Sequence, residues 1–288
     1  MACELHPGAA TSWSVPIPTT LAIAAGVLLY LRGWRLLRRS SPEVATGHRP
    51  WAFVGGMLVL WVVVGSPLSA LDHALLTFHM VQHLLLMTVA APLILLGTPG
   101  VALVRGVPGL IRRAAGMFLR SAAVRRIGRS LTHPVSCWVA GTAVVVAWHV
   151  PPAHELGMSS HWWHAIQQAS FFAAGLLFWW PVIGAGPSSN ALPRGFVPLY
   201  LFLATLPCDA LSAFLAFCGR VVYPSHHAAS PLLGLSPLHD QEFAGALMWF
   251  WVTIAYLLPA IAITLRVLSP SRRAPSHDVR LGGASNLN

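Results

Sequence analysis

The sequence contains no lysine and few charged residues of any kind. Among its 288 residues, only 9% are charged and 56% are hydrophobic. A soluble domain of this length cannot cover its surface with so little charge, so most of the chain must face lipid. Since one membrane-spanning helix takes about 20 mostly apolar residues, the length accommodates about seven such helices and no sizeable soluble domain. We therefore predict an all-α, polytopic membrane helix bundle.

Motifs that define several enzyme classes are also missing. There is no Walker motif and no GxSxG, GxGxxG or HExxH sequence. Nucleotide use, α/β-hydrolase chemistry and zincin chemistry therefore lack support. The four cysteines lie far apart without a CxxC pair, which gives neither a disulfide framework nor a thiol-exchange motif. We expect a protein that is not an enzyme.

Apolar runs between charged or Pro/Gly-rich breaks predict seven membrane helices. The odd number puts the two termini on opposite sides of the membrane. We assign residues 1–268 to a single transmembrane domain and expect the polar residues 269–288 to form a disordered cytoplasmic tail. The predicted helices lie near residues 16–34, 50–66, 74–97, 134–150, 162–184, 196–219 and 243–267.

Arginine is confined almost entirely to one side of this topology. Seventeen of the eighteen arginines fall in the first, third and fifth links or in the tail, and Arg220 is the exception. By the positive-inside rule that side is cytoplasmic, so the amino terminus is outside. The net charge of +10 then indicates a lipid bilayer as partner and no nucleic acid. Residues 103–131 interleave arginine with apolar side chains, which is typical of a helix in the headgroup plane or of a solvated basic loop.

Histidine has the opposite distribution, since eleven of the fourteen histidines map to outer helix ends or outer links. Imidazole is the commonest protein ligand for transition metals. His79 and His83 are four residues apart, and Asp72 precedes His79 by seven, so the three share one helical face. Such a histidine pair can bind one metal ion, serve as axial ligands to separate groups, or hydrogen-bond within the bundle.

Other outer residues are further candidates. His149 ends an apolar helix, where a polar group is costly unless it is partnered, so it is a better ligand candidate than His154. His161 lies beside two tryptophans and suits the headgroup zone. Asp240 is placed either to cap a helix or to join a site. The weaker candidates for a metal site are Asp72, His73, His161 and His239.

Two features deeper in the chain stay open. Asp209 follows Pro207 in the sixth predicted helix, where it is either a functional intramembrane carboxylate or a protonated packing group. Methionine thioethers suit Cu(I), although methionine at helical positions usually packs. The methionines in question are Met57, Met80, Met87, Met158 and Met248.

A series of short motifs resembles the CtaG family of cytochrome c oxidase assembly factors, in order over about residues 70–268. The motifs are His79-Met80-Val81-Gln82-His83, His133-Pro134, Trp148-His149-Val150-Pro151, Trp179-Trp180-Pro181, Tyr223-Pro224 and Asp240-Gln241. The resemblance implies a multi-pass protein of the bacterial plasma membrane that is needed to form active haem–copper oxidase, with copper as the usual cargo. It also implies an outer polar group made of His79, His83, His149 and His164, with Asp240 near them. The expected partners are oxidase subunits and periplasmic copper chaperones.

One stretch departs from the family pattern. Relatives commonly read HxxEH where this chain has His164-Ala165-Ile166-Gln167-Gln168. Two amides thus replace a charged pair that could bind metal, so either the essential ligands lie elsewhere or this member has a modified role. The pair Cys208-Asp209 is also unusual beside the small residues expected there.

Three functions remain open at this point. The leading hypothesis is an assembly protein whose outer histidines bind copper and hand it over. The second is a haem-binding redox or haem-handling membrane protein, in which His79 or His83 pairs with His149 or His164 as axial ligands. The third is a membrane transporter, with Asp209 and Pro207 in a broken sixth helix.

Overall fold

The computed structural model describes residues 16–40, 47–66, 72, 75–184, 191–226 and 234–269. All regular structure in these residues is helical, without a strand, so the prediction of an all-α fold is confirmed. The expected tail lies outside the described residues, apart from position 269. The division of the chain into domain and tail therefore stays a prediction.

Each of the seven predicted apolar segments forms a helix. The links contain α5 (Pro99–Gly106), α6 (Gly109–Arg120), α7 (Ala122–Leu131), α9 (Pro151–Met158) and the 3₁₀ turn η4 (Pro224–His226). The predicted segments correspond to α1 (Ile17–Ser40), α2 (Arg49–Gly65), the run α3–η2–α4 (Leu76–Leu85, Leu86–Ala90, Ala91–Leu96), α8 (Pro134–His149), α10 (His161–Ile183), η3–α11 (Arg194–Phe196, Val197–Phe217) and α12 (Pro237–Leu268).

Five of these helical segments are long and apolar enough to span a membrane: α1, α3–α4, α10, η3–α11 and α12. A sixth span results if α7 and α8, which are bent by 65°, count as one. Helices α2 and α8 have 17 and 16 residues, or about 25 Å at 1.5 Å per residue, against about 30 Å of hydrocarbon. The described residues thus support a membrane bundle with five or six candidate spans. The count of seven and the orientation of the termini stay predictions.

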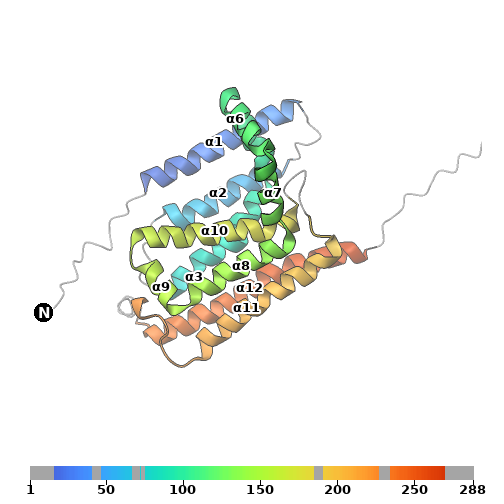
Figure 1. Ribbon diagram of the computed structural model, residues 1–288. Helices are drawn as coiled ribbons and strands as arrows, with labels where there is room; N and C mark the ends of the chain where they lie inside the picture. Colours follow the sequence, from blue (N-terminus) through green and yellow to red (C-terminus); the bar gives the residue numbers. More distant parts are fainter. Residues whose placement is uncertain are drawn as a thin grey trace, which may run out of the picture.

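The main apolar core lies among the run α3–η2–α4 and helices α8, α10, α11 and α12, which run side by side (Figure 1). A second apolar cluster joins this core to α1, α2 and α5. Helices α1 and α5 cross closely, because a Cβ on Gly33 would lie 1.7 Å from the Ala102 carbonyl oxygen. Small residues at such crossings are a common means of packing helices in membranes.

The third apolar segment is interrupted by a π-helical turn, η2. Pro92 has no N–H to donate to the Thr88 carbonyl, so regular α-helical bonding fails at this point, and the turn immediately precedes it. Helix α10 approaches this turn closely, since a Cβ on Gly175 would lie 2.8 Å from the Met87 Cα. The Trp179 indole N–H donates to the Met87 carbonyl at 2.9 Å. Turns of this type often occur at functional sites.

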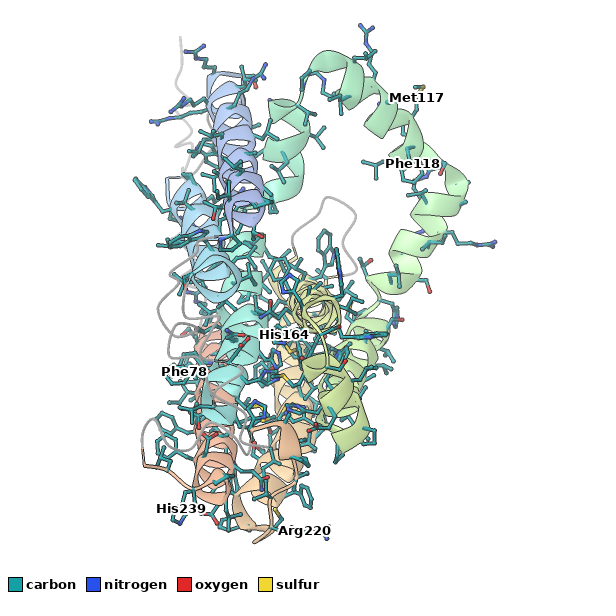
Figure 2. The ribbon with its side chains drawn as sticks, turned by 90° about the vertical axis from the view of Figure 1, so that its left-hand side faces the viewer. Phe78, Met117, Phe118, His164, Arg220 and His239 are labelled. Atoms are coloured by element: carbon teal, nitrogen blue, oxygen red, sulfur yellow. The ribbon has the colours of Figure 1, made fainter. Side chains whose placement is uncertain are left out.

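Residues 103–131 form the end of α5 and the short amphipathic helices α6 and α7. Figure 2 shows α6 and α7 as an arch that stands away from the packed helices, with Met117 and Phe118 labelled on it. Both labelled side chains are exposed. Of the two possibilities for this segment, helix or basic loop, the structure has helix.

Candidate metal site

His79 lies at the centre of a group of histidine side chains. It is carried by α3 and is fully buried. Its ring centroid lies 4.3 Å from that of His83, 5.0 Å from His154, 5.6 Å from His164 and 5.7 Å from His226. These residues belong to α3, α9, α10 and η4, so segments far apart in the sequence converge here. Figure 2 shows His164 in the interior of the bundle.

Asp72 adds a carboxylate to this group. Its Oδ2 lies 2.7 Å from His164 Nε2, and both side chains are buried. One ligand atom each from Asp72, His79 and His164 lies within 4.8 Å of the other two. Tetrahedral ligands at about 2.0–2.1 Å from a metal are about 3.4 Å apart, so a small side-chain movement would close these three around an ion. We refer to Asp72, His79, His154, His164 and His226 as the histidine cluster.

Several buried ring nitrogens have no hydrogen-bond partner within the described part of the chain. They are both nitrogens of His79 and the Nε2 atoms of His83, His149 and His154. Burying a polar atom without a partner costs roughly 1–3 kcal/mol, so a cluster of them requires compensation. The lone pair of a neutral imidazole is a metal ligand. The residues present therefore fit a transition metal ion.

The His149 ring is held in one tautomer. Its Nδ1 lies 2.7 Å from the Val145 carbonyl oxygen, and since a carbonyl can only accept, Nδ1 carries the proton. The lone pair is then on Nε2. The Tyr223 hydroxyl donates to the His149 carbonyl at 2.9 Å and ties the end of α8 to the segment before η4. Backbone support of this kind orients histidine ligands in metal proteins.

His154 and His226 differ in their hydrogen bonds. His226 uses both ring nitrogens, since Nε2 donates to the Asp72 carbonyl at 3.2 Å and Nδ1 lies 3.2 Å from Ser225 Oγ. Burial is the main cause that lowers the pKa of both histidines, that of His154 to about 3. Both imidazoles are therefore neutral at pH 7, which is the form that binds metal. His154 can offer Nε2, whereas His226 holds the backbone of Asp72.

Asp240 caps helix α3. Its Oδ2 accepts from the Leu76 backbone N–H at 2.7 Å, and its Oδ1 accepts from the Thr77 backbone N–H at 3.2 Å and from the Thr77 hydroxyl at 2.6 Å. A carboxylate is favourable at a helix amino terminus because the first N–H groups are unpaired there. Asp240 thus holds the helix that carries His79 and His83. Ser236, and not Asp240, caps α12 itself.

The two glutamines in the stretch that departs from the family pattern, Gln167 and Gln168, have different surroundings. Gln168 Nε2 lies 2.8 Å from His164 Nε2 and 3.0 Å from Gln82 Oε1. One ring nitrogen cannot accept from Gln168 and donate to Asp72 at the same time, so the two groups compete for His164 Nε2. Gln167 is fully buried against Gly157 of α9. Gln168 therefore contacts the cluster directly, and Gln167 packs beside it.

The structure brings together some of the sequence candidates and separates others. His79, His83 and His164 converge, and His149 lines a cavity that His83 also lines. Asp72, a weaker candidate, lies inside the cluster. His161 and His239 are exposed, and Figure 2 shows His239 at the end of the bundle, away from His164. His73 lies outside the described residues.

Sequence reasoning did not single out His154 or His226. His154 ranked below His149 because His149 ends an apolar helix, where a polar group is costly unless it is partnered, whereas His154 falls in the following link. The structure instead turns this link back as helix α9 and buries His154 fully. His226 had a sequence signal, because it follows the Tyr223-Pro224 motif closely.

Comparison with known proteins identifies a family over most of the chain. The family model for the cytochrome c oxidase caa3 assembly factor (Caa3_CtaG) matches residues 28–269. Uncharacterized proteins of Mycobacterium bovis and Mycobacterium tuberculosis are each 27% identical over 272 residues, which are 89% of this chain and 40% of each relative. One from Mycobacterium leprae is 23% identical over 246 residues, 81% of this chain and 36% of the relative. The chain thus spans less than half the length of these curated relatives. No solved structure matches it.

Proposed function

Because this chain belongs to the Caa3_CtaG family of cytochrome c oxidase caa3 assembly factors, we propose that its histidine cluster binds copper and hands it to the oxidase. Copper is the cargo in this proposal, and the protein performs no catalytic step. The protein acts in the bacterial plasma membrane with the cluster toward the outer face. It receives the ion from a periplasmic copper donor and meets subunits of the oxidase there.

The observation that carries this proposal is the set of buried, unpaired imidazole nitrogens around one carboxylate. His79 has no hydrogen-bond partner for either ring nitrogen among the described residues, yet the side chain is fully buried. A cation bound at this point would satisfy the orphaned nitrogens and offset the negative charge of Asp72. His79, His164 and Asp72 would hold the ion, and the His154 ring is a neighbour of His79, with ring centroids 5.0 Å apart.

The same arrangement suits release of the ion as well as binding. Imidazole and carboxylate ligands bind Cu(I) and Cu(II), and selectivity among metals depends on geometry and availability. The Gln168 side chain competes for His164 Nε2, and the His226 and Asp240 contacts hold the segments around the ion. With three ligands and a fourth neighbour nearby, the ion keeps an open position. A ligand of the accepting protein can enter there, and the cluster ligands can then be replaced one at a time.

The alternatives receive less support from the geometry. Haem needs a site of several hundred cubic ångströms, whereas the cavity that borders His83 and His149 has a volume of about 30 Å³. The transporter hypothesis expects a break at Pro207, but α11 continues through that residue. Copper handling is therefore the function that we propose.

The test replaces two cluster histidines by glutamine, which keeps a polar side chain of similar size. We expect H79Q/H164Q to lower the copper bound per chain and the oxidase activity of the membranes by about ten-fold or more. The abundance of the protein should be unchanged. The matched control is H161Q/H239Q, which changes two exposed histidines and should behave as the unmodified protein. Normal oxidase activity in H79Q/H164Q would refute the proposal, and stoichiometric iron in place of copper would favour haem.

A further inference from the structure

A small cavity lies next to the histidine cluster, deeper along the same helices. It has a volume of about 30 Å³, which is room for one water molecule or one ion. Met87 and Met248 lie eight residues beyond His79 and Asp240, or about 12 Å along the run α3–η2 and along α12 at 1.5 Å per residue. We call this site the thioether cavity, after the methionine, histidine and cysteine side chains in its lining: Met80, His83, Met87, His149, Cys208 and Met248.

The cavity is formed by packing that fixes its walls. Met80 and His83 are three residues apart on α3, and Met87 follows four residues later at the start of η2. The π-helical turn η2 begins just before Met87, whose carbonyl accepts from the Trp179 indole. Next to it, Thr88 accepts from the Trp251 indole at 2.8 Å. Helices α8, α11 and α12 supply the other residues.

Two of the side chains that line this cavity are buried imidazoles whose Nε2 atoms lack a hydrogen-bond partner among the described residues. They belong to His83 and His149. Both side chains are more than nine-tenths buried. The tautomer of His149 leaves its lone pair on Nε2, and His83 stacks on Phe171 with ring centroids 3.9 Å apart. The cavity is therefore not a purely apolar void.

The ligand atoms around the cavity are soft and uncharged. Thioethers select Cu(I) over harder cations, and three methionines, two histidines and Cys208 line the cavity. Since burial of charge in a membrane is costly, a site without a carboxylate favours an ion of charge one. We infer that the thioether cavity is a second metal site, which binds a single Cu(I) ion.

This inference rests on the proposed function and extends it. The ring centroids of His79 and His83 are 4.3 Å apart. His79 belongs to the histidine cluster and His83 lines the cavity, so the two sites adjoin at this pair. Copper can pass between the two sites by exchange of one imidazole for the other. The ion remains Cu(I) throughout, so no electron donor or acceptor is needed. The cavity then acts as a store behind the transfer site.

The experiment uses the full chain, purified in detergent with its methionines replaced by selenomethionine and loaded with Cu(I) under reducing conditions. X-ray absorption at the selenium edge detects copper bonded to selenium. We expect a copper neighbour in the unmodified protein and in M57L, because Met57 packs against the α1 and α2 cluster instead. The variant M87L/M248L should lose this neighbour and about half of the bound copper. Methionine-to-leucine changes preserve volume, so the fold should be retained.

The outcomes separate this inference from the proposed function. If copper binds and is lost in H79Q/H164Q, but no selenium has a copper neighbour, the thioether cavity is not a metal site and the proposed function stands. An unchanged copper content in M87L/M248L would likewise overturn the inference. If the unmodified protein binds no copper at all, both the inference and the proposed function fail. A copper–selenium signal that survives in H79Q/H164Q supports two separate sites.

Discussion

The histidine cluster and the thioether cavity are built on the same helices, yet they offer a metal ion different surroundings. The cluster contains a carboxylate, that of Asp72, and imidazoles from four segments. The cavity has neutral sulfur and imidazole groups and room for a single ion. A site with a negative charge tolerates either oxidation state of copper, whereas a neutral buried site favours the monovalent ion. A few turns of helix thus separate a site suited to exchange from one suited to storage.

The largest expected effect comes from the residue on which both sites depend. Asp240→Ala removes the carboxylate that caps α3, the helix that carries His79, Met80 and His83 and continues into η2 with Met87. We expect copper to be lost from both sites and the free energy of unfolding to fall by about 2 kcal/mol. Copper content and melting temperature in detergent measure the two effects. The control is Glu242→Gln, which removes one negative charge from the same turn of α12. A variant with its copper and melting temperature intact would show that this cap does not organise the sites.

Acid should destabilise the protein through His154 of the histidine cluster. The pKa of His154 in the folded protein is about 3, below the value of about 6.5 for an exposed histidine. The unfolded chain therefore binds more protons between these pH values, so stability is complete above about pH 6.5 and is lost as the pH falls toward 3. The slope is at most about 1.4 kcal/mol per pH unit for this group. Melting temperatures between pH 7.5 and 4.5 measure it.

Substitutions at the two sites should separate the sources of this acid sensitivity. His154→Gln removes the titrating group and should give a shallower loss of stability with falling pH. M87L/M248L should keep the slope of the unmodified protein, because thioethers do not titrate. Equal slopes in H154Q and the unmodified protein would mean that His154 is not the group responsible.

The smallest expected effect concerns the stretch that departs from the family. Gln168→His replaces an amide that competes for His164 Nε2 with an imidazole one turn away. We expect copper affinity at the cluster to rise, by up to about ten-fold, and affinity at the cavity to stay the same. Competition with a Cu(I) chelator measures both affinities. The matched variant Gln167→Asn changes the neighbouring amide, which packs against Gly157. It should not raise the copper affinity of the cluster. A weaker cluster in Q168H would mean that the glutamine supports His164 and does not compete with Asp72.

Much of the fold could be predicted because apolar runs and charge patterns are local properties of the sequence. All seven predicted helical segments exist, with ends that differ by a few residues for most of them. The number of spans was harder to predict, because α2 and α8 are short for a bilayer and α8 is bent against α7. The sequence reports how apolar a segment is, but not how far it extends across the membrane. Whether a helix spans the membrane depends on its length, and the length is known only once both ends of the helix are known.

The candidate site could be predicted in part, from the spacing of residues along one helix and from the family motifs. The spacing of His79 and His83 predicts their shared face of α3, and the family motifs added His149 and His164. The expectation that Asp72 shares this helical face was wrong, because α3 begins at Leu76 after an extended Leu75. The position of His154 depends on how the link after Pro152 turns back as α9, which no local pattern specifies. Asp240 could be identified as a helix cap, but its helix is α3, more than 160 residues away in the chain. Long-range pairings of this kind require the packed structure.

The cap of α3 by Asp240 also has a consequence for the order of events during synthesis. A chain is made from its amino terminus, so α3 leaves the ribosome long before residue 240 exists. The first N–H groups of α3 have no carboxylate to bind until α12 has entered the membrane beside it. The histidine cluster thus reaches its final form only when the last helix is in place. Under the proposed function, we therefore expect an incomplete nascent chain not to bind copper in this site.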